Sequence, residues 1–176
     1  MNALLARTVR PLLRRRSWWL VAPLLLGASA DANALCTVVC ACSVSTTSVT
    51  FGSQSPLSAA ANDSTGTVKV SCGGIVGLAI PYQIDLGKGS SGSYTTRRMT
   101  SGAYTLNYNL YIDSNRSQVW GDGSAGTQSV SGGFLLDVLA TAPPQTVTVY
   151  GRIPGSQTGA APGNYTDAIG VTVTYY

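Results

Sequence analysis

Four cysteines, Cys36, Cys40, Cys42 and Cys72, are the residues of this sequence whose type and spacing best suit covalent or metal chemistry. The C-x3-C-x-C spacing offers no second pair of zinc ligands, and the chain has no histidine, so disulfides are favoured over zinc. Three connectivities are possible. A bridge from Cys42 to Cys72 would close a loop of about 30 residues and contribute roughly 3–4 kcal/mol. Cys36 and Cys40 could then close a small local loop.

The residues that commonly perform catalysis are missing or isolated. Without histidine, a serine or cysteine nucleophile lacks its usual general base, and no G-x-S-x-G motif occurs. The aspartates stand singly at the ends of predicted strands and in turns, where Asp is a common turn former, rather than as a pair suited to glycoside hydrolysis. The sequence therefore predicts no enzymatic activity, no catalytic residue, no bound metal and no cofactor.

Trp120, beside Gly121-Asp122-Gly123, has two interpretations. It could be a surface aromatic that contacts a ligand such as a sugar, or a packing anchor, which is the commoner role in a sandwich with few large aromatics. The glycine-rich residues 87–92 join two predicted strands and open no helix, which favours a hairpin loop over a phosphate cradle. The dibasic pair Arg97-Arg98 is interpreted as a strand edge with its basic stems over apolar surface.

The N-terminus has the layout of a secretory signal, which must be excluded from fold reasoning. A basic region reaches to Arg16, and residues 18–30 are apolar but too few to span a bilayer, which needs roughly 20 residues. Ala32-Asn33-Ala34 provides a small-x-small cleavage pattern, although cleavage after Ala30 or Ala32 would fit too. We predict a signal peptide over residues 1–34 and one exported domain over residues 35–176, with no stable membrane span.

Removing the signal changes the charge balance. The whole chain carries a formal charge of +4. Five of its eleven Lys and Arg residues, and one of its seven acidic residues, precede residue 35. The remaining domain is therefore close to neutral. Nucleic-acid binding needs clustered basic residues on the folded domain, so no nucleic-acid partner is predicted.

Alternating apolar and polar residues predict about seven strands with one buried face. The clearest segment is 104–112, in which Leu106, Tyr108 and Leu110 share a face. Glycine-rich and proline-rich turns separate the segments, and no pattern favours a helix. This arrangement predicts an all-β, two-sheet sandwich, with a barrel as the alternative. The predicted strands cover residues 43–51, 66–72, 80–86, 104–112, 134–140, 146–153 and 167–176.

Seven short motifs in a fixed order carry a resemblance to a known family. They are Cys42 leading into VTFG at 49–52, TVKVSC at 67–72, Arg98-Met99, LNYNLYID at 106–113, WGDG at 120–123, VTVYGRIPGSQ at 147–157 and PGNYTDAIGVTVTY at 162–175. Taken together, they resemble the spore coat U domain family, which includes pilins of archaic, Csu-type chaperone-usher pili. The resemblance extends over nearly the whole predicted exported domain.

The resemblance implies an immunoglobulin-like sandwich that lacks its last strand. A periplasmic pilus chaperone would first fill the groove with one of its strands. At the outer-membrane usher, the N-terminal extension of another pilin subunit would then replace that strand. It also implies a Cys42 to Cys72 bridge, a place in a cell-surface pilus, and roles in adhesion and biofilm formation. The final strand, which ends at Tyr176, would leave the open edge that such an assembly needs.

The predicted mature N-terminus is short for a donor strand. Only residues 35–41 precede Cys42, and they extend roughly 23 Å at about 3.3 Å per residue. A Cys36–Cys40 bridge would prevent them from lying straight. The domain would then accept a strand without giving one, as a terminal subunit does. A self-sufficient secreted coat or matrix protein, and a carbohydrate-binding adhesin domain that uses Trp120, are the alternatives.

Overall fold

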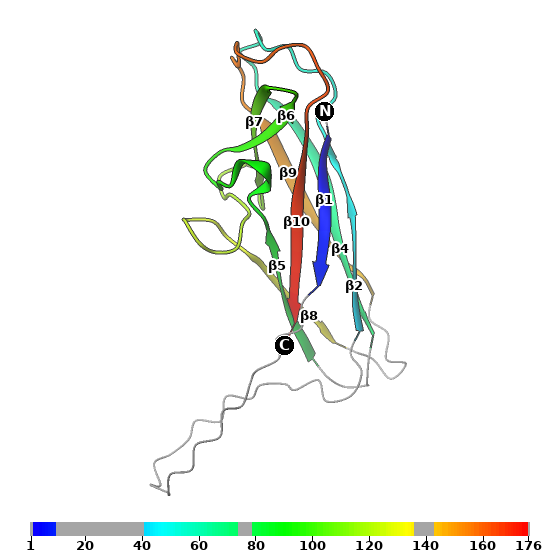
Figure 1. The fold of residues 1–176 in the computed structure, drawn as a ribbon. Helices are drawn as coiled ribbons and strands as arrows, with labels where there is room; N and C mark the ends of the chain where they lie inside the picture. The colour runs from blue at the N-terminus through cyan, green and yellow to red at the C-terminus, as the bar shows by residue number, and fades with distance from the viewer. Residues whose placement is uncertain (1, 10–40, 74–78, 136–142, 176) are drawn as a thin grey trace, which may run out of the picture.

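The computed structural model of the chain describes residues 2–9, 41–73, 79–135 and 143–175 (Figure 1). These residues form ten β-strands and one short 3-10 helix, and no α-helix occurs among them. The prediction of an all-β fold is confirmed. The elements are β1 Asn2–Val9, β2 Ala41–Thr47, β3 Val49–Thr50, β4 Asn62–Gly73, β5 Ala79–Leu86, η1 Gly89–Ser91, β6 Arg97–Ser101, β7 Tyr104–Tyr111, β8 Val130–Leu135, β9 Gln145–Ile153 and β10 Thr166–Tyr175.

The strands form two layers that are joined at one corner. One layer has the order β2-β4-β9-β7, and the other has the order β8-β5-β10-β1-β3. Strand β6 pairs with β7 along its length and meets β10 at Thr100 and Thr166, which links the layers into one continuous sheet. The architecture is the predicted immunoglobulin-like sandwich.

The core lies between the layers and follows the alternation of each strand. In β5, Ile80, Tyr82, Ile84 and Leu86 are all buried, as expected for a strand with one face toward the interior. Strands β4, β7 and β10 repeat the pattern with inward-facing valines, leucines and isoleucines. A single cluster of buried side chains results, so one hydrophobic core stabilises both layers.

All seven predicted segments contain strands, with shifted limits. The segment 43–51 is two strands, because β2 pairs with β4 in one layer and β3 pairs with β1 in the other. The chain changes layer at Ser48, and Gly66 permits the crossing, since a Cβ there would lie 2.6 Å from the carbonyl oxygen of Thr47. The segment 134–140 begins earlier, as β8, and residues 136–142 lie outside the described structure.

Two further strands were not expected from the sequence. Strand β6 contains the dibasic pair, which the sequence suggested only as a strand edge. Strand β1 comes from residues that the signal-peptide prediction excludes from the fold. Each adds pairing at a critical place: β6 closes the corner between the layers, and β1 lies inside the second layer.

Candidate functional site

The candidate site is the space between β10 and β3, which strand β1 fills (Figure 1). Strand β1 runs parallel to β10 in a register that extends from Asn2 opposite Thr166 to Val9 opposite Val173. On its other side it pairs antiparallel with β3, where Ala3 lies opposite Val49. It is the one parallel partner among the strand pairings of the described residues. The first residues of the chain therefore complete a layer that is otherwise built by residues 49–175.

The two strands that flank β1 present apolar side chains to the core. Val49 on β3 and Ile169, Val171 and Val173 on β10 are fully buried. Without β1, the facing backbone edges of β10 and β3 would lose their hydrogen-bond partners, and this apolar floor would be opened. An acceptor of this kind suits an extended peptide, because backbone edges give affinity and alternate pockets give specificity.

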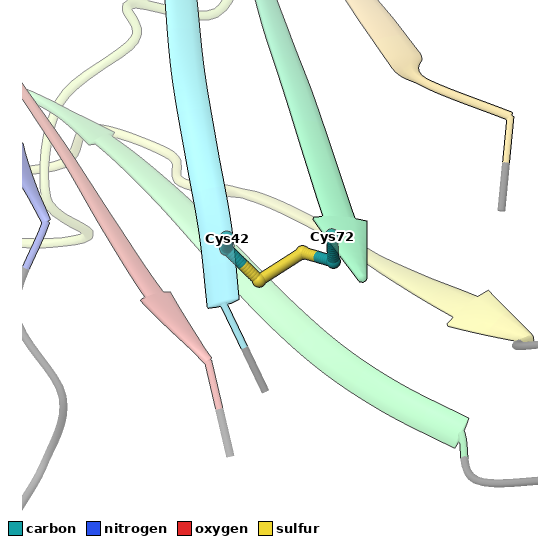
Figure 2. The surroundings of a disulfide bond; sticks show 2 residues. All are labelled: Cys42 and Cys72. Carbon is teal, nitrogen blue, oxygen red and sulfur yellow. A yellow bond between two sulfur atoms is a disulfide. The ribbon is translucent and has the colours of Figure 1, made fainter. Parts of the chain in front are cut away.

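A disulfide joins Cys42 and Cys72 near the start of β2 and the end of β4 (Figure 2). The two residues are directly opposite in the antiparallel register, with Cα atoms 4.1 Å apart. The structure therefore contains the bridge that the family resemblance implies. It fixes the strand that leads into β3 and hence one wall of the groove. Cys36 and Cys40 lie outside the described residues, so their pairing stays a prediction.

A buried arginine, which sequence reasoning placed at a strand edge, organises the neighbouring corner. Arg97 is fully buried, whereas Arg98 points outward. The Arg97 guanidinium donates hydrogen bonds to the carbonyl oxygen of Gly87 (3.0 and 2.8 Å), to the carbonyl oxygen of Trp120 (2.7 Å) and to Oδ1 of Asn109 (2.7 Å). It thus ties together the loop after β5, strand β7 and the segment around Trp120. The signal was available, since Arg97 has the same alternation phase as the buried Met99.

Asp167 is the one buried acid among the described residues. Its carboxylate accepts hydrogen bonds from the backbone N–H of Ser90 (2.9 Å), the hydroxyl of Tyr108 (2.7 Å) and its own neighbour's N–H at Ala168 (2.9 Å). Burial of the Tyr108 hydroxyl, together with its hydrogen bond to Asp167, raises the pKa of Tyr108 well above its usual value. Burial lowers the pKa of Arg97, although guanidinium remains charged in proteins. The cluster is saturated with partners and offers no reactive group.

Trp120 lies in the core and not on the surface. Its side chain is fully buried, and the indole N–H donates to the carbonyl oxygen of Ile84 (3.0 Å). The alternative of a surface ligand contact at Trp120 is therefore wrong, and the packing interpretation holds. The physical reason is that the bridge from Trp120 to Gln128 and the backbone hydrogen bond from Trp120 to Leu110 hold this segment against β7.

Three described aspartates, Asp63, Asp113 and Asp122, each accept hydrogen bonds of their own, and none is paired with another acid. Asp63 accepts a two-pronged contact from Arg152 (2.7 and 2.8 Å), and these hydrogen bonds lower its pKa. Asp113 and Asp122 accept hydrogen bonds within their own turns. No group of three or more His, Cys, Asp or Glu side chains comes together in the part of the chain that the structure describes. No described helix is long and apolar enough to cross a membrane.

A cavity of about 420 Å³ lies between the loop that follows β3 and the loop that precedes β10. Its lining includes Gln54, Asn164 and Tyr165 and has no charged side chain. The two loops that line it lie at the end of the sandwich opposite to the start of β2 and the end of β4 (Figure 1). It provides space but no catalytic group.

Comparison with known proteins places these features in a family. The model of the Spore Coat Protein U domain matches residues 28–172. Among solved structures, the chain resembles the crystal structure of the CsuC-CsuE chaperone-tip adhesion subunit pre-assembly complex from archaic chaperone-usher Csu pili of Acinetobacter baumannii, with a TM-score of 0.51 and 20% identity. The likeness covers 77% of this chain but only 40% of that chain, and at this identity it shows a shared fold alone.

A search among curated proteins found no match. The family model, however, extends from residue 28 to residue 172 and so spans most of the sequence. It includes both disulfide cysteines, the buried arginine cluster and seven of the ten residues of β10. This chain belongs to the Spore Coat Protein U domain family.

Proposed function

We propose that this protein is a non-enzymatic structural subunit of a bacterial chaperone-usher surface pilus that is assembled by donor-strand complementation. The observation that carries the proposal is the strand-shaped site between β10 and β3. Membership of the Spore Coat Protein U domain family supports it. A shared fold with a structure that contains a chaperone and a tip subunit of Csu pili supports it further.

The physical role of each partner follows from the two exposed edges that this site has when β1 is absent. A periplasmic chaperone would supply a strand to β10 and β3, which covers the apolar floor and keeps the subunit from aggregating. At the outer-membrane usher, the N-terminal segment of another pilin subunit would replace that strand. The exchange adds one subunit to the fibre by strand replacement alone and needs no chemical reaction.

The chain is better suited to accept a strand than to give one. The pairing of β10 with β1 covers eight residues, from Thr166 to Val173, or roughly 26 Å of strand. If cleavage follows Ala34 as predicted, only residues 35–40 precede β2, because β2 begins at Ala41. They span roughly 20 Å at most. A position at the end of a fibre, where a subunit accepts but does not donate, fits this difference.

The proposed route is export on the N-terminal signal, passage through the periplasm, and display on the cell surface in the pilus. Adhesion to surfaces and biofilm formation would follow from that display. The disulfide between Cys42 and Cys72 agrees with an oxidising compartment, since such bonds persist outside the cytosol.

The test is to express residues 35–176 in the periplasm with and without the chaperone of an archaic pilus system. The proposal expects a one-to-one complex with the chaperone, and degradation or aggregation of the subunit without it. A stable monomer that never co-purifies with the chaperone would falsify the proposal. As a control, a chaperone with a proline in its donor strand should fail to rescue the subunit, because proline removes a ladder hydrogen bond.

One observation favours a second function, that of a self-sufficient secreted coat or matrix protein. The groove is filled by the chain's own residues 2–9, so a form that retains them needs no partner strand. For such a protein, added donor peptides would leave the melting temperature unchanged. A rise of several degrees would instead support the pilus subunit.

A further inference from the structure

We propose that Asp167 is a positioning residue for the incoming strand, because its carboxylate takes the place of a strand that β10 lacks on one side. The inference rests on the proposed function, since β10 is one wall of the same acceptor groove. It concerns the shape of that wall and not a contact with the partner. Asp167 is buried and is the second residue of β10.

Strand β10 changes its neighbour along its length. On the side away from the groove it meets β6 only at Thr166, and it pairs with β5 only from Val171 onwards. Residues 167–170, here called the gap segment, have no strand partner on this side in the described part of the chain. In Figure 1 the loop that carries η1 lies beside β10 at this point, between β6 and β5. A loop rather than a strand therefore has to satisfy the backbone of the gap segment.

The backbone groups of a strand point alternately to its two sides. The carbonyl oxygen of Gly170 faces the gap, where it accepts a hydrogen bond from the N–H of Gly87 (2.8 Å). The N–H of Ala168 faces the gap too, and it donates to Oδ1 of Asp167 (2.9 Å). By alternation, the backbone groups of Asp167 and Ile169 face the groove. The gap side is thus satisfied from within the subunit, and the groove side stays free for a donor strand.

The Asp167 carboxylate also links β10 to two other elements. It accepts hydrogen bonds from the N–H of Ser90 in η1 (2.9 Å) and from the hydroxyl of Tyr108 on β7 (2.7 Å). A Cβ at Gly89 would collide with this carboxylate, so the loop lies directly against it. A carboxylate has enough acceptor sites to serve all of these donors at once. One side chain therefore fixes the gap segment to the loop and to the other layer.

This arrangement divides the groove wall into two parts. From Val171 to Val173 the wall is held by pairing with β5, whereas the gap segment is held by Asp167 and the loop that carries η1. With no strand in the groove, the gap segment has no strand partner on either side among the described residues. Loss of Asp167 should then weaken donor pairing at Ile169 and leave pairing at Val171 and Val173 unchanged. A residue with only a general role in stability would weaken all three positions.

The test uses the full chain, exported on its own signal and bound to the chaperone of an archaic pilus system, whose strand is the probe. Amide hydrogen exchange is measured residue by residue along β10 in wild type, Asp167→Ala and Asp167→Asn. In Asp167→Ala, protection of the Ile169 N–H should fall at least about tenfold, while that of Val171 and Val173 should change less than about threefold. Asp167→Asn keeps a side-chain oxygen that can accept both N–H groups, so it should restore most of the protection at Ile169.

Asp85→Ala is the matched control. Asp85 lies on β5 directly opposite Thr172 of β10, and its carboxylate accepts hydrogen bonds from Gln83 of its own strand. Its replacement removes a carboxylate beside β10 without touching the gap segment. The exchange of the Ile169 amide should therefore stay as in wild type.

If Asp167→Ala fails to accumulate, Ser90→Pro tests the same link from the loop. Ser90 lies in a 3-10 helix, where φ is close to that of proline, so the substitution removes the N–H that Asp167 accepts and little else of the backbone. Ser90→Ala keeps this N–H and is the control. Protection at Ile169 should fall in Ser90→Pro and not in Ser90→Ala.

The outcomes separate this inference from the proposed function. Equal loss of protection along all of β10, no loss at Ile169, or an Asp167→Asn variant as weak as Asp167→Ala would overturn the role of Asp167 and leave the pilus proposal standing. A wild-type protein that is stable alone and never binds the chaperone would refute the pilus proposal instead.

Discussion

Arg97 gives the sharpest test of the packing argument, because its neighbour Arg98 is a built-in control. In Arg97→Met, a shorter, unbranched side chain remains and all four donated hydrogen bonds are lost. The carbonyl oxygens of Gly87 and Trp120 then lose their guanidinium donors, while Oδ1 of Asn109 still accepts from a backbone N–H at 3.0 Å. The structure therefore predicts that one buried acceptor, at Trp120, and one part-buried acceptor, at Gly87, have lost a strong partner.

Each such acceptor costs about 1–3 kcal/mol, so the expected loss is about 4 kcal/mol. Removing one member of a buried charged network gives a similar figure. With a urea m-value of about 2 kcal/mol/M, the unfolding midpoint should fall by about 2 M. Arg97→Lys keeps the charge but not the planar fork, and it should lose about half as much.

The assay is urea unfolding of the full chain, followed by circular dichroism at neutral pH. Arg98→Met, on the exposed face of the same strand, should stay within about 0.5 kcal/mol of the wild type. If Arg97→Met also lost less than about 1 kcal/mol, the buried network would contribute little, and the reasoning from unsatisfied acceptors would be refuted.

Three other perturbations have expected outcomes. Replacing Cys42 and Cys72 together by serine opens a loop with a sequence separation of 30 and should lower the free energy of unfolding by about 3.5 kcal/mol, measured by urea unfolding. Reduced wild type is the control and should be about as unstable as the double variant; a double variant much less stable than reduced wild type would show that the loss does not come from the disulfide. Asp63→Asn should cost no more than about 1 kcal/mol at pH 7, because the pair with Arg152 is partly exposed. Since the folded-state pKa of Asp63 is lowered from 3.8, its contribution is present above about pH 4 and disappears as pH falls through the lowered value; a difference from wild type that stayed constant down to pH 2 would contradict this. Trp120→Phe keeps an aromatic ring but removes a buried hydrogen bond and should cost about 2–3 kcal/mol in the same unfolding assay, whereas an unchanged midpoint would argue against the packing role.

Local alternation made most strands predictable from the sequence. In β5, and from Ile169 to Val173 in β10, every second residue is apolar, and the structure buries those same residues. A strand has a fixed period of two, so the pattern identifies the element and its inward face without knowledge of its neighbours. The same alternation, extended from Met99 back to Arg97, predicts that Arg97 is buried. The charge of Arg97 instead favoured the interpretation as a strand edge, and that interpretation was wrong for this residue.

Which strands pair with one another could not be predicted from the alternation of side chains. The alternation of β2 and β3 gives no sign that the chain changes layer between them, because the change depends on which strands lie beside each segment. Trp120 is similar, since its burial arises from pairing with residues before and after it in the chain. Long-range pairing is decided by the packing of the whole sandwich.

The amino-acid pattern was enough to specify the all-β class, the inward faces of the strands, the absence of histidine chemistry and the motifs of the family. That β10 and β3 form two edges of one groove, which residues 2–9 fill, became evident from the folded chain alone. The physical reason is that a side-chain pattern specifies which face of a strand is buried. Its backbone edges carry the same N–H and C=O groups in every sequence, so a strand's neighbour is fixed only when the sheet is assembled.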